Sequence, residues 1–379
     1  MSSEQTDTTG RPCPDVLDPG AAEPGLQRIV DQWLSFHDVL CLRPARAVRW
    51  LIEEAGDPVR ALRRADEATS LPLGVPSPRR SALARIGVVG VPYPSPRYPP
   101  LLRAIPDPPP LLLVRGSVEV LQRPTVAIVG ARAATSYGRG VARDLAGGLA
   151  RSGIVVISGL ARGIDAAAHE GALEAGGTTV AVQACGPDIT YPPEHRGLAD
   201  RIADRGAVIT ELPPGRAPVA AHFPLRNRLI SGLSRAVVVV EARPRSGSLI
   251  TARHALDQGR EVLAVPGPVT APTSVGPNSL LRDGARPVIE LADVLDAIGF
   301  DSVKRSPGTE PTRNPTTPSS DHERILGLLR EVPCTPDELL RALDWLPGKL
   351  AADLLELRLD GRVVEDRDGR LRVPARGVF

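Results

Sequence analysis

The stretch TVAIVGARAATSYGRGVARDLAGGLARSGIVVISG, residues 125–159, decides the fold of this 379-residue chain. It begins with a short apolar strand, continues through a helical pattern of apolar residues at three- and four-residue spacing, and ends in a second apolar strand. Strands without polar alternation are typical of a parallel sheet that helices cover on both faces. The stretch therefore predicts a strand–helix–strand unit of an α/β fold.

Four further apolar segments continue the alternation of strand and helix. They are TTVAVQ (178–183), AVITEL (207–212), RAVVVVEA (235–242) and EVLAVPG (261–267). Helical patterns at 164–177 and 248–259 separate some of them. Residues 124–300 are thus predicted to form an α/β, Rossmann-like doubly wound parallel sheet.

The flanking segments differ from this core in composition. Residues 1–25 are rich in Pro, Gly, Asp and Thr and are interpreted as a disordered tail. Residues 26–90 have helical periodicity and predict a small, SAM-like helical domain, and the proline-dense residues 91–123 predict an extended connector with one short strand. Residues 301–320 have the composition of a linker, and residues 321–379 predict three helices and a hairpin, the pattern of a winged helix.

Composition excludes several classes of protein. Lys304 and Lys349 are the lysines among 46 basic residues, so residues 1–300 contain neither a phosphate-loop lysine nor a Schiff-base lysine. The four cysteines form no CxxC pair, and no His–carboxylate spacing indicates a metal ligand set, so we expect no metal and no cofactor. The chain has no apolar run near the ~20 residues that span a bilayer and no apolar N-terminal signal, which predicts a cytoplasmic protein without membrane contact.

The loops after the strands lack the dinucleotide signature. The first reads GARAATSYG (130–138) instead of GxGxxG, and the second strand ends in Ser158-Gly159 where an acidic residue would bind a ribose. Both departures argue against a nicotinamide-dependent dehydrogenase.

The same loops are rich in Gly, Ser and Arg, at the edge of the sheet where α/β proteins bind ligands. The candidate phosphate-binding arginines are Arg132, Arg162, Arg226, Arg228, Arg243 and Arg245. The candidate anion-binding loops contain Gly130, Ser158, Gly159, Gly163, Ser246, Gly247, Ser248 and Thr251. Simpler roles stay open: tight turns for the glycines, helix caps for the serines, and the N-cap of a helix for Asp165.

The core resembles the DNA-processing protein A (DprA/Smf) family. The motifs that carry the resemblance are VGARAATSYG (129–138), SGLARGIDAAAHEGAL (158–173), YPPEH (191–195), FPLRNRLISGLS (223–234), VVEARPRSGSLITARHALDQGREVLAVPG (239–267) and GPNSLLRDGA (276–285). The resemblance implies a homodimer that binds single-stranded DNA without sequence preference and delivers it to the RecA recombinase during natural transformation and recombination. It implies DNA contacts for Arg132, Arg162, Arg226 and Arg228, and a supporting role for Asn227 within the FPLRNR turn.

One alternative function follows from the residues. Asp165, His169, Glu170, Glu211 and Glu241 could serve as acid–base groups of a nucleotide-binding or nucleotide-hydrolysing enzyme, although the chain has ARPRSGSLITA where such hydrolases have PGGxGTxxE. A packing role is favoured for His169, and no enzymatic activity is expected.

The C-terminal and aromatic residues set two further expectations. The winged-helix segment 321–373 has 9 basic and 12 acidic residues, which favours a protein-interaction or regulatory role over duplex reading.

Aromatic residues make up 3% of the chain, so binding should depend on phosphate contacts, with little base stacking.

Overall fold

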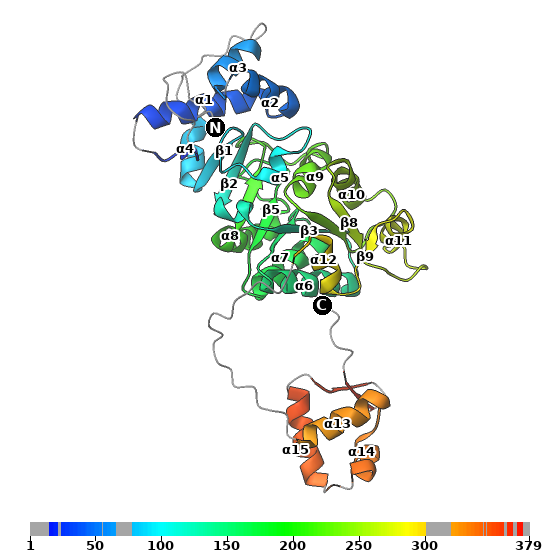
Figure 1. The fold of residues 1–379 in the computed structure, drawn as a ribbon. Helices are drawn as coiled ribbons and strands as arrows, with labels where there is room; N and C mark the ends of the chain where they lie inside the picture. The colour runs from blue at the N-terminus through cyan, green and yellow to red at the C-terminus, as the bar shows by residue number, and fades with distance from the viewer. Residues whose placement is uncertain are drawn as a thin grey trace. The chain divides into compact units, whose positions relative to one another are not determined.

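The computed structural model describes residues 15–21, 24–54, 56–65, 78–300, 320–343, 345, 347–359, 362–366 and 370–373 (Figure 1). The chain divides into two compact units, with the boundary at residues 302 and 303. The first unit contains the α/β core, and the second contains the C-terminal helices.

A nine-stranded sheet in the described part of the first unit has the order β1-β2-β6-β5-β4-β3-β7-β8-β9. The strands are β1 (Val88–Pro92), β2 (Leu111–Gly116), β3 (Thr125–Val129), β4 (Val155–Ser158), β5 (Thr179–Val182), β6 (Ala207–Thr210), β7 (Ala236–Val239), β8 (Glu261–Ala264) and β9 (Arg286–Pro287). Neighbouring strands from β6 to β9 are parallel, which confirms the predicted Rossmann-like sheet, and β1 and β2 add an antiparallel edge.

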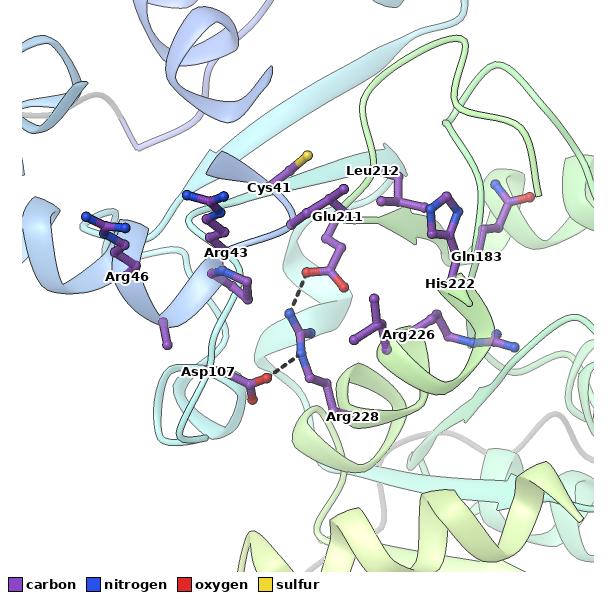
Figure 2. Close-up of a pocket in the computed structure, with 14 residues that line it drawn as sticks. Cys41, Arg43, Arg46, Asp107, Gln183, Glu211, Leu212, His222, Arg226 and Arg228 are labelled. Atoms are coloured by element: carbon purple, nitrogen blue, oxygen red, sulfur yellow. Dashed lines mark hydrogen bonds and ion pairs between the residues drawn. The ribbon is translucent and has the colours of Figure 1, made fainter. Parts of the chain in front are cut away.

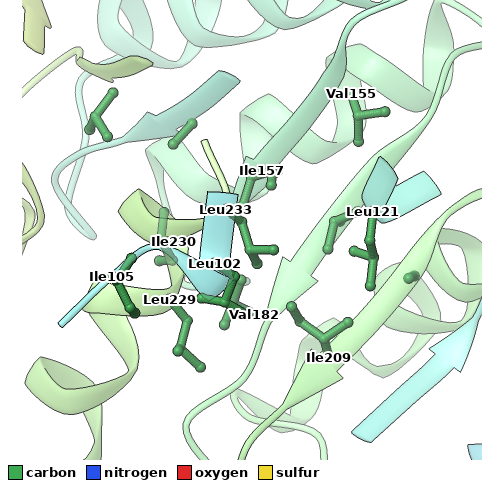
Figure 3. Close-up of a cluster of buried hydrophobic side chains, with 14 of the residues drawn as sticks. Leu102, Ile105, Leu121, Val155, Ile157, Val182, Ile209, Leu229, Ile230 and Leu233 are labelled. Atoms are coloured by element: carbon green, nitrogen blue, oxygen red, sulfur yellow. The ribbon is translucent and has the colours of Figure 1, made fainter. Parts of the chain in front are cut away.

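Helices cover both faces of the sheet because the central strands, β3 to β7, are buried and predominantly apolar on both sides. On β3, Val126 and Ile128 join the core under α6 (Ser136–Arg151), α7 (Ile164–Glu174) and α12 (Leu291–Ala297). Ala127 and Val129 join the opposite core, under α5 (Pro100–Arg103), α9 (His222–Gly232) and α10 (Gly247–Asp257). Figure 3 shows this second core, where Leu229 and Ile230 of α9 lie among strand residues.

Three more helices complete the α/β core. They are α8 (Arg196–Arg205), which packs beside α7, α11 (Val275–Arg282), and the 3-10 helix η2 (Pro193–His195); a further 3-10 turn, η1, spans Glu119–Gln122.

The short strand expected within the connector at 91–123 is β2, but β1 and β2 are both strands of the main sheet, so this segment is part of the α/β core and not a separate connector. The boundary expected at residue 90 cuts β1, whose residues pair with β2 from Val88 to Pro92. Leu17 also pairs with Gly90 through two backbone hydrogen bonds, so part of the predicted disordered tail belongs to the fold. Residues 1–14 and 22–23 lie outside the described residues.

The N-terminal helices are α1 (Pro24–Leu40), α2 (Pro44–Glu53), α3 (Pro58–Ala65) and α4 (Pro78–Arg85). Trp33, Phe36 and Leu51 pack against Leu111 and Leu113 of β2. The helical region is therefore confirmed, but it shares its core with the edge of the sheet.

The second unit has the order of a winged helix. It consists of α13 (Ser320–Glu331), α14 (Pro336–Leu343), α15 (Pro347–Leu359) and a hairpin of β10 (Val364–Glu365) with β11 (Leu371–Arg372), which confirms the prediction. The predicted linker, apart from Ser320, lies outside the described residues. Of the helices that the structure describes, none has the length and apolarity to cross a membrane.

Candidate nucleic-acid interface

A crevice lies at the carboxyl ends of the central strands. From β3 the chain passes to β4 on one side, and from β7 it passes to β8 on the other, so β3 and β7 flank the topological switch point. A cavity of about 320 Å³ lies there, bordered by the 130–133 loop after β3, the first turn of α9 and the first turn of α10. The predicted loops at 130–133 and 246–248 thus meet at one place.

Four of the six predicted arginines are exposed around this edge. Arg132 and Arg243 border the crevice. Arg162 borders a small adjoining hollow and pairs with the carboxylate of Glu194, and Arg245 follows at the entrance to α10. An exposed ion pair such as Arg162–Glu194 contributes little stability, so these guanidinium groups are available to bind phosphate oxygens.

The other two arginines are buried, which corrects the expectation that they present free guanidinium groups to DNA. Arg226 is 5% exposed and its Nη1 donates to the carbonyl oxygens of Gly159, at 2.7 Å, and Val182. Burial lowers the pKa of Arg226 to about 10, and nearby Asp165 opposes this shift. Arg226 forms the floor of the crevice rather than its rim.

Arg228 lies one step further inside, between two carboxylates (Figure 2). Its Nη2 is 2.6 Å from Glu211 Oε2 and its Nε is 2.8 Å from Asp107 Oδ2. Residues of the FPLRNR motif belong to α9, and the helical periodicity places Arg228 away from the crevice. We therefore assign Arg228 to the interior ion-pair network.

The loop after β4 is occupied by a side chain of the protein itself. The Oδ2 atom of Asp165 accepts the backbone amides of Gly159, at 3.1 Å, and Ala161, at 3.4 Å. Burial raises the pKa of Asp165, and Arg226 opposes the rise. These backbone amides already donate to the Asp165 carboxylate. The anion site predicted at Ser158 and Gly159 is therefore occupied by a side chain of the protein in this structure.

Gly163 is the N-cap of α7, a position expected for Asp165. Its φ is +78°, and a Cβ there would lie 2.2 Å from the carbonyl oxygen of Ala131. Gly163 thus allows the first two loops to approach closely, in agreement with the turn alternative.

The N-terminus of α10 opens into the crevice. Ser246 is its N-cap: the hydroxyl accepts the amide of Ser248 at 3.4 Å and lies 2.8 Å from the Ser248 hydroxyl. The side-chain amide of Asn227 donates to the carbonyl of Gly247 at 3.1 Å, so Asn227 joins α9 to α10 rather than closing a turn. Thr251 is buried at the base of this helix end, and anion binding by these residues stays a prediction.

An aromatic cluster at the rim was missed by the sequence analysis. The Arg132 guanidinium lies over the ring of Phe223, and the rings of Phe223 and Tyr191 meet edge to face at 5.6 Å. Tyr191 is 41% exposed and Phe223 is half-buried. The low aromatic content hid this cluster, although Phe223 directly begins the FPLRNR motif.

The candidate acid–base groups have structural partners. Glu241 accepts the amide and hydroxyl of Thr135, at 2.9 and 2.5 Å, and thereby fixes the start of α6. Glu170 pairs with Arg143, at 2.6 Å. His169 is buried with Nδ1 at 2.7 Å from the hydroxyl of Thr179, and desolvation lowers its pKa to about 3, which supports its packing role. The described residues contain no cluster of three or more His, Cys, Asp or Glu that could hold a metal.

Fold and site together define a Rossmann-like α/β protein with an arginine-bordered crevice at the switch point, followed by a winged helix. The family model for DNA recombination-mediator protein A matches residues 91–299, and the model for the DprA winged helix domain matches residues 309–369. The chain belongs to the DNA recombination-mediator protein A (DprA/Smf) family.

Individual relatives agree with this family. A putative DNA processing protein DprA of Mycobacterium tuberculosis is 44% identical over 255 residues, which cover 66% of this chain and 65% of the relative. The DNA processing protein DprA of Bacillus subtilis is 42% identical over 213 residues, or 56% of this chain and 72% of that protein. The X-ray structure of DprA from Streptococcus pneumoniae has a TM-score of 0.55 and 34% identity, and the match covers 74% of this chain and 94% of that one.

Proposed function

We propose that this chain binds single-stranded DNA across the carboxyl edge of its sheet. The observation that carries the proposal is the row of exposed arginines, Arg132, Arg162, Arg243 and Arg245, around a crevice that contains a helix N-terminus. Phosphates contact the arginines and the amides at the start of α10, and the contacts carry no base specificity.

We propose that the aromatic cluster of Tyr191 and Phe223 gives the preference for single-stranded over duplex DNA. An unpaired base can stack on the ring of Tyr191, which is 41% exposed, or on the Arg132 guanidinium where it lies over Phe223. A duplex has its bases stacked and paired, so it offers phosphates to the arginines but no free base face to the rings.

The biological role that fits this binding is recombination mediation, in which the protein holds incoming single strands and transfers them to RecA during natural transformation. The family description supports recombination mediation, and RecA is the recombinase that such a mediator would serve. We further propose a cytoplasmic homodimer without enzymatic activity, in which two crevices bind one strand. The structural partners of Glu170, Glu211 and Glu241 support the non-enzymatic part.

A protein-contacting role is proposed for the winged helix. Several of its cations are paired with acidic side chains, as in Lys349–Asp321, Arg362–Glu323 and Arg372–Asp366. Paired cations release few counter-ions from DNA, so this unit is poorly suited to duplex binding.

Fluorescence anisotropy of labelled oligo(dT) and of a duplex of equal length, each at several salt concentrations, tests DNA binding. We expect wild type to bind the single strand more tightly, with a log–log salt slope of about −0.7 per contacted phosphate. Arg132→Ala/Arg162→Ala should bind more weakly with a shallower slope. Arg235→Ala, at the amino end of β7, removes an exposed arginine from the opposite edge and should bind as wild type does.

Equal binding by the double variant and by wild type would reject the proposed path. Release of a nucleobase from a mononucleotide would instead support the hydrolase alternative.

A further inference from the structure

A second cavity, of about 400 Å³, lies on the same carboxyl edge of the sheet as the crevice, between the α/β core and the N-terminal helices (Figure 2). Gln183, directly after β5, and Glu211, directly after β6, line it from the sheet. Residues 41–46, around the start of α2, line it from the N-terminal helices. The first turn of α9 separates the second cavity from the crevice, and Arg226 borders both. The two hollows are therefore neighbours along one edge of the sheet.

Exposed arginines border the second cavity on the side of the N-terminal helices. Arg43 is the N-cap residue of α2 and Arg46 lies in its first turn, and both line the cavity (Figure 2). Neither forms an ion pair with a carboxylate among the residues that the structure describes. The guanidinium carbon of Arg46 lies 4.5 Å from the centroid of the Trp50 ring. Both cations can therefore bind phosphate oxygens without the loss of an ion pair.

A third exposed arginine, Arg216, belongs to the loop after β6. Burial raises the pKa of the Cys41 thiol, and the positive charge of Arg216 opposes this rise, which places Arg216 near the turn between α1 and α2. The carbonyl of Arg216 accepts the amide of Gly186 at 2.8 Å, so this loop is tied to the loop after β5. Arg43, Arg46 and Arg216, here called the outer arginines, thus extend the positive charge of the carboxyl edge toward the N-terminal helices.

The carboxylates of the second cavity are held by an interior cation. Arg228 lies 2.8 Å from Asp107 and 2.6 Å from Glu211, and these ion pairs leave one negative charge uncompensated. The three outer arginines exceed that single charge, so the charge around the opening favours a polyanion.

The surface between the crevice and the outer arginines is apolar. Leu225, on the first turn of α9, is 48% exposed and lines the second cavity, and Pro224 beside it borders the crevice. Pro44 and Ala45 add an apolar wall on the side of α2. A single strand offers both phosphates and unpaired bases, and so it can contact cations and an apolar surface in succession.

We propose that a bound single strand continues from the crevice over the first turn of α9 to the N-terminal helices, where the outer arginines contact its phosphates. The inference rests on the proposed function and extends it, because it makes the N-terminal helical region part of the DNA-binding surface. Bases of this part of the strand pack against Leu225 and the apolar wall of α2. Contacts of this kind are independent of sequence.

Fluorescence anisotropy of the full chain with labelled oligo(dT) of two lengths tests the proposal. A strand of about 5 nucleotides occupies the crevice, and a strand of about 15 nucleotides also reaches the outer arginines, and both lengths lie within the usual range of single-strand site sizes. We expect wild type to bind the longer strand more tightly and with a steeper salt slope, because more phosphates release counter-ions.

Removal of two outer arginines should affect the longer strand alone. Arg43→Ala/Arg46→Ala should weaken its binding about tenfold and make the log–log salt slope shallower by about 1.4, which is about 0.7 for each lost phosphate contact. Binding of the shorter strand should stay as in wild type. Arg85→Ala is the matched control, because Arg85 is an exposed arginine at the end of α4, close to the amino ends of the parallel strands. It should bind both lengths as wild type does.

A variant of α9 tests the same path independently of α2. Leu225→Asp places a carboxylate between the two hollows and should weaken binding of the longer strand through charge repulsion, with little effect on the shorter one. Leu225→Asn has nearly the same shape as the aspartate without its charge, and its effect should be smaller.

The outcomes separate this inference from the proposed function. Wild-type binding of the longer strand by both Arg43→Ala/Arg46→Ala and Leu225→Asp would overturn the extended path. Equal weakening of both lengths would also overturn it, because the effect would then not depend on the added part of the strand. If Arg132→Ala/Arg162→Ala still weakened both lengths in either case, the crevice would stay as the whole site. Absence of binding of either strand by wild type would reject both proposals.

Discussion

The guanidinium carbon of Arg132 lies 5.0 Å from the centroid of the Phe223 ring. This contact joins the loop after β3 to the first turn of α9, two segments that are about ninety residues apart in the chain and border the same crevice. It places a cation for phosphate directly above an aromatic surface for a base. The pair thus combines the two kinds of contact that non-specific single-strand binding uses.

Replacement of Phe223 tests the aromatic half of this pair. Phe223→Leu should weaken oligo(dT) binding by about 1–3 kcal/mol, because base stacking is lost while the phosphate contacts stay. Phe223→Tyr retains a ring and should bind nearly as wild type does. Anisotropy at fixed salt measures both, and wild-type affinity in Phe223→Leu would exclude stacking on this side chain.

Replacement of Arg228 distinguishes an interior ion pair from a DNA contact. Arg228→Met leaves the buried carboxylate of Glu211 without its partner and should lower the free energy of unfolding by about 3–5 kcal/mol. Arg228→Met/Glu211→Leu removes both charges and should recover most of that stability. Urea denaturation measures the difference between the two variants.

DNA binding of the double variant completes this test. We expect Arg228→Met/Glu211→Leu to bind oligo(dT) with the wild-type salt slope, because Arg228 lies away from the crevice. A slope that is shallower by about 0.7 would restore Arg228 to the set of phosphate ligands.

The sequence predicted the sheet and the location of the site because both depend on local pattern. Apolar strands such as 125–129 have the same signal in any parallel sheet, and carboxyl-end loops converge wherever the strands are parallel. The burial of Arg226 and Arg228 depends on partners that are remote in the chain, such as Asp107 and Gly159. No local pattern contains that information.

The same reasoning explains why the strand predicted at 111–116 was not assigned to the main sheet. Proline-rich segments usually predict extended linkers, and β2 is extended, but its membership of the sheet depends on antiparallel pairing with β6, almost a hundred residues later. Asp165 was expected to cap α7 because acidic residues are common there, yet the cap position belongs to Gly163. Tertiary contacts with Arg226 and two loop amides determine where the Asp165 carboxylate lies.

Two glycines of α6 make a matched pair for testing the start of that helix. A Cβ on Gly138 would lie 2.4 Å from Cδ of Glu241 and displace the carboxylate that binds Thr135. Gly138→Ala should therefore cost about 1–3 kcal/mol of stability and weaken DNA binding through the displaced first loop. At Gly140 no described atom other than those of its chain neighbours and the backbone of α6 lies within 4 Å of the position that an alanine methyl group would take, so Gly140→Ala should be neutral or stabilise by up to about 1 kcal/mol. Thermal unfolding compares the two, and equal losses would exclude the proposed clash.

His169 should make stability depend on pH. Thr179 donates its hydroxyl hydrogen to the carbonyl of Val156, so Nδ1 of His169 donates to Thr179, and Nε2 has no partner within the part of the chain that is described. The pKa of His169 is lowered to about 3 because a second proton would create a buried charge. Below the unfolded-state pKa of about 6.5, only the unfolded chain takes up this proton, and the stabilising contribution of the neutral ring is lost as pH falls.

The free energy of unfolding should accordingly decrease by about 2 kcal/mol for this residue between pH 7.5 and pH 5. His169→Gln removes the titrating ring, so the difference in unfolding free energy between pH 7.5 and pH 5 should shrink by that amount relative to wild type. Urea denaturation at both pH values measures it. An unchanged difference would mean that His169 is protonated in the folded protein or gains a partner for Nε2, and the packing role assigned to it would then be wrong.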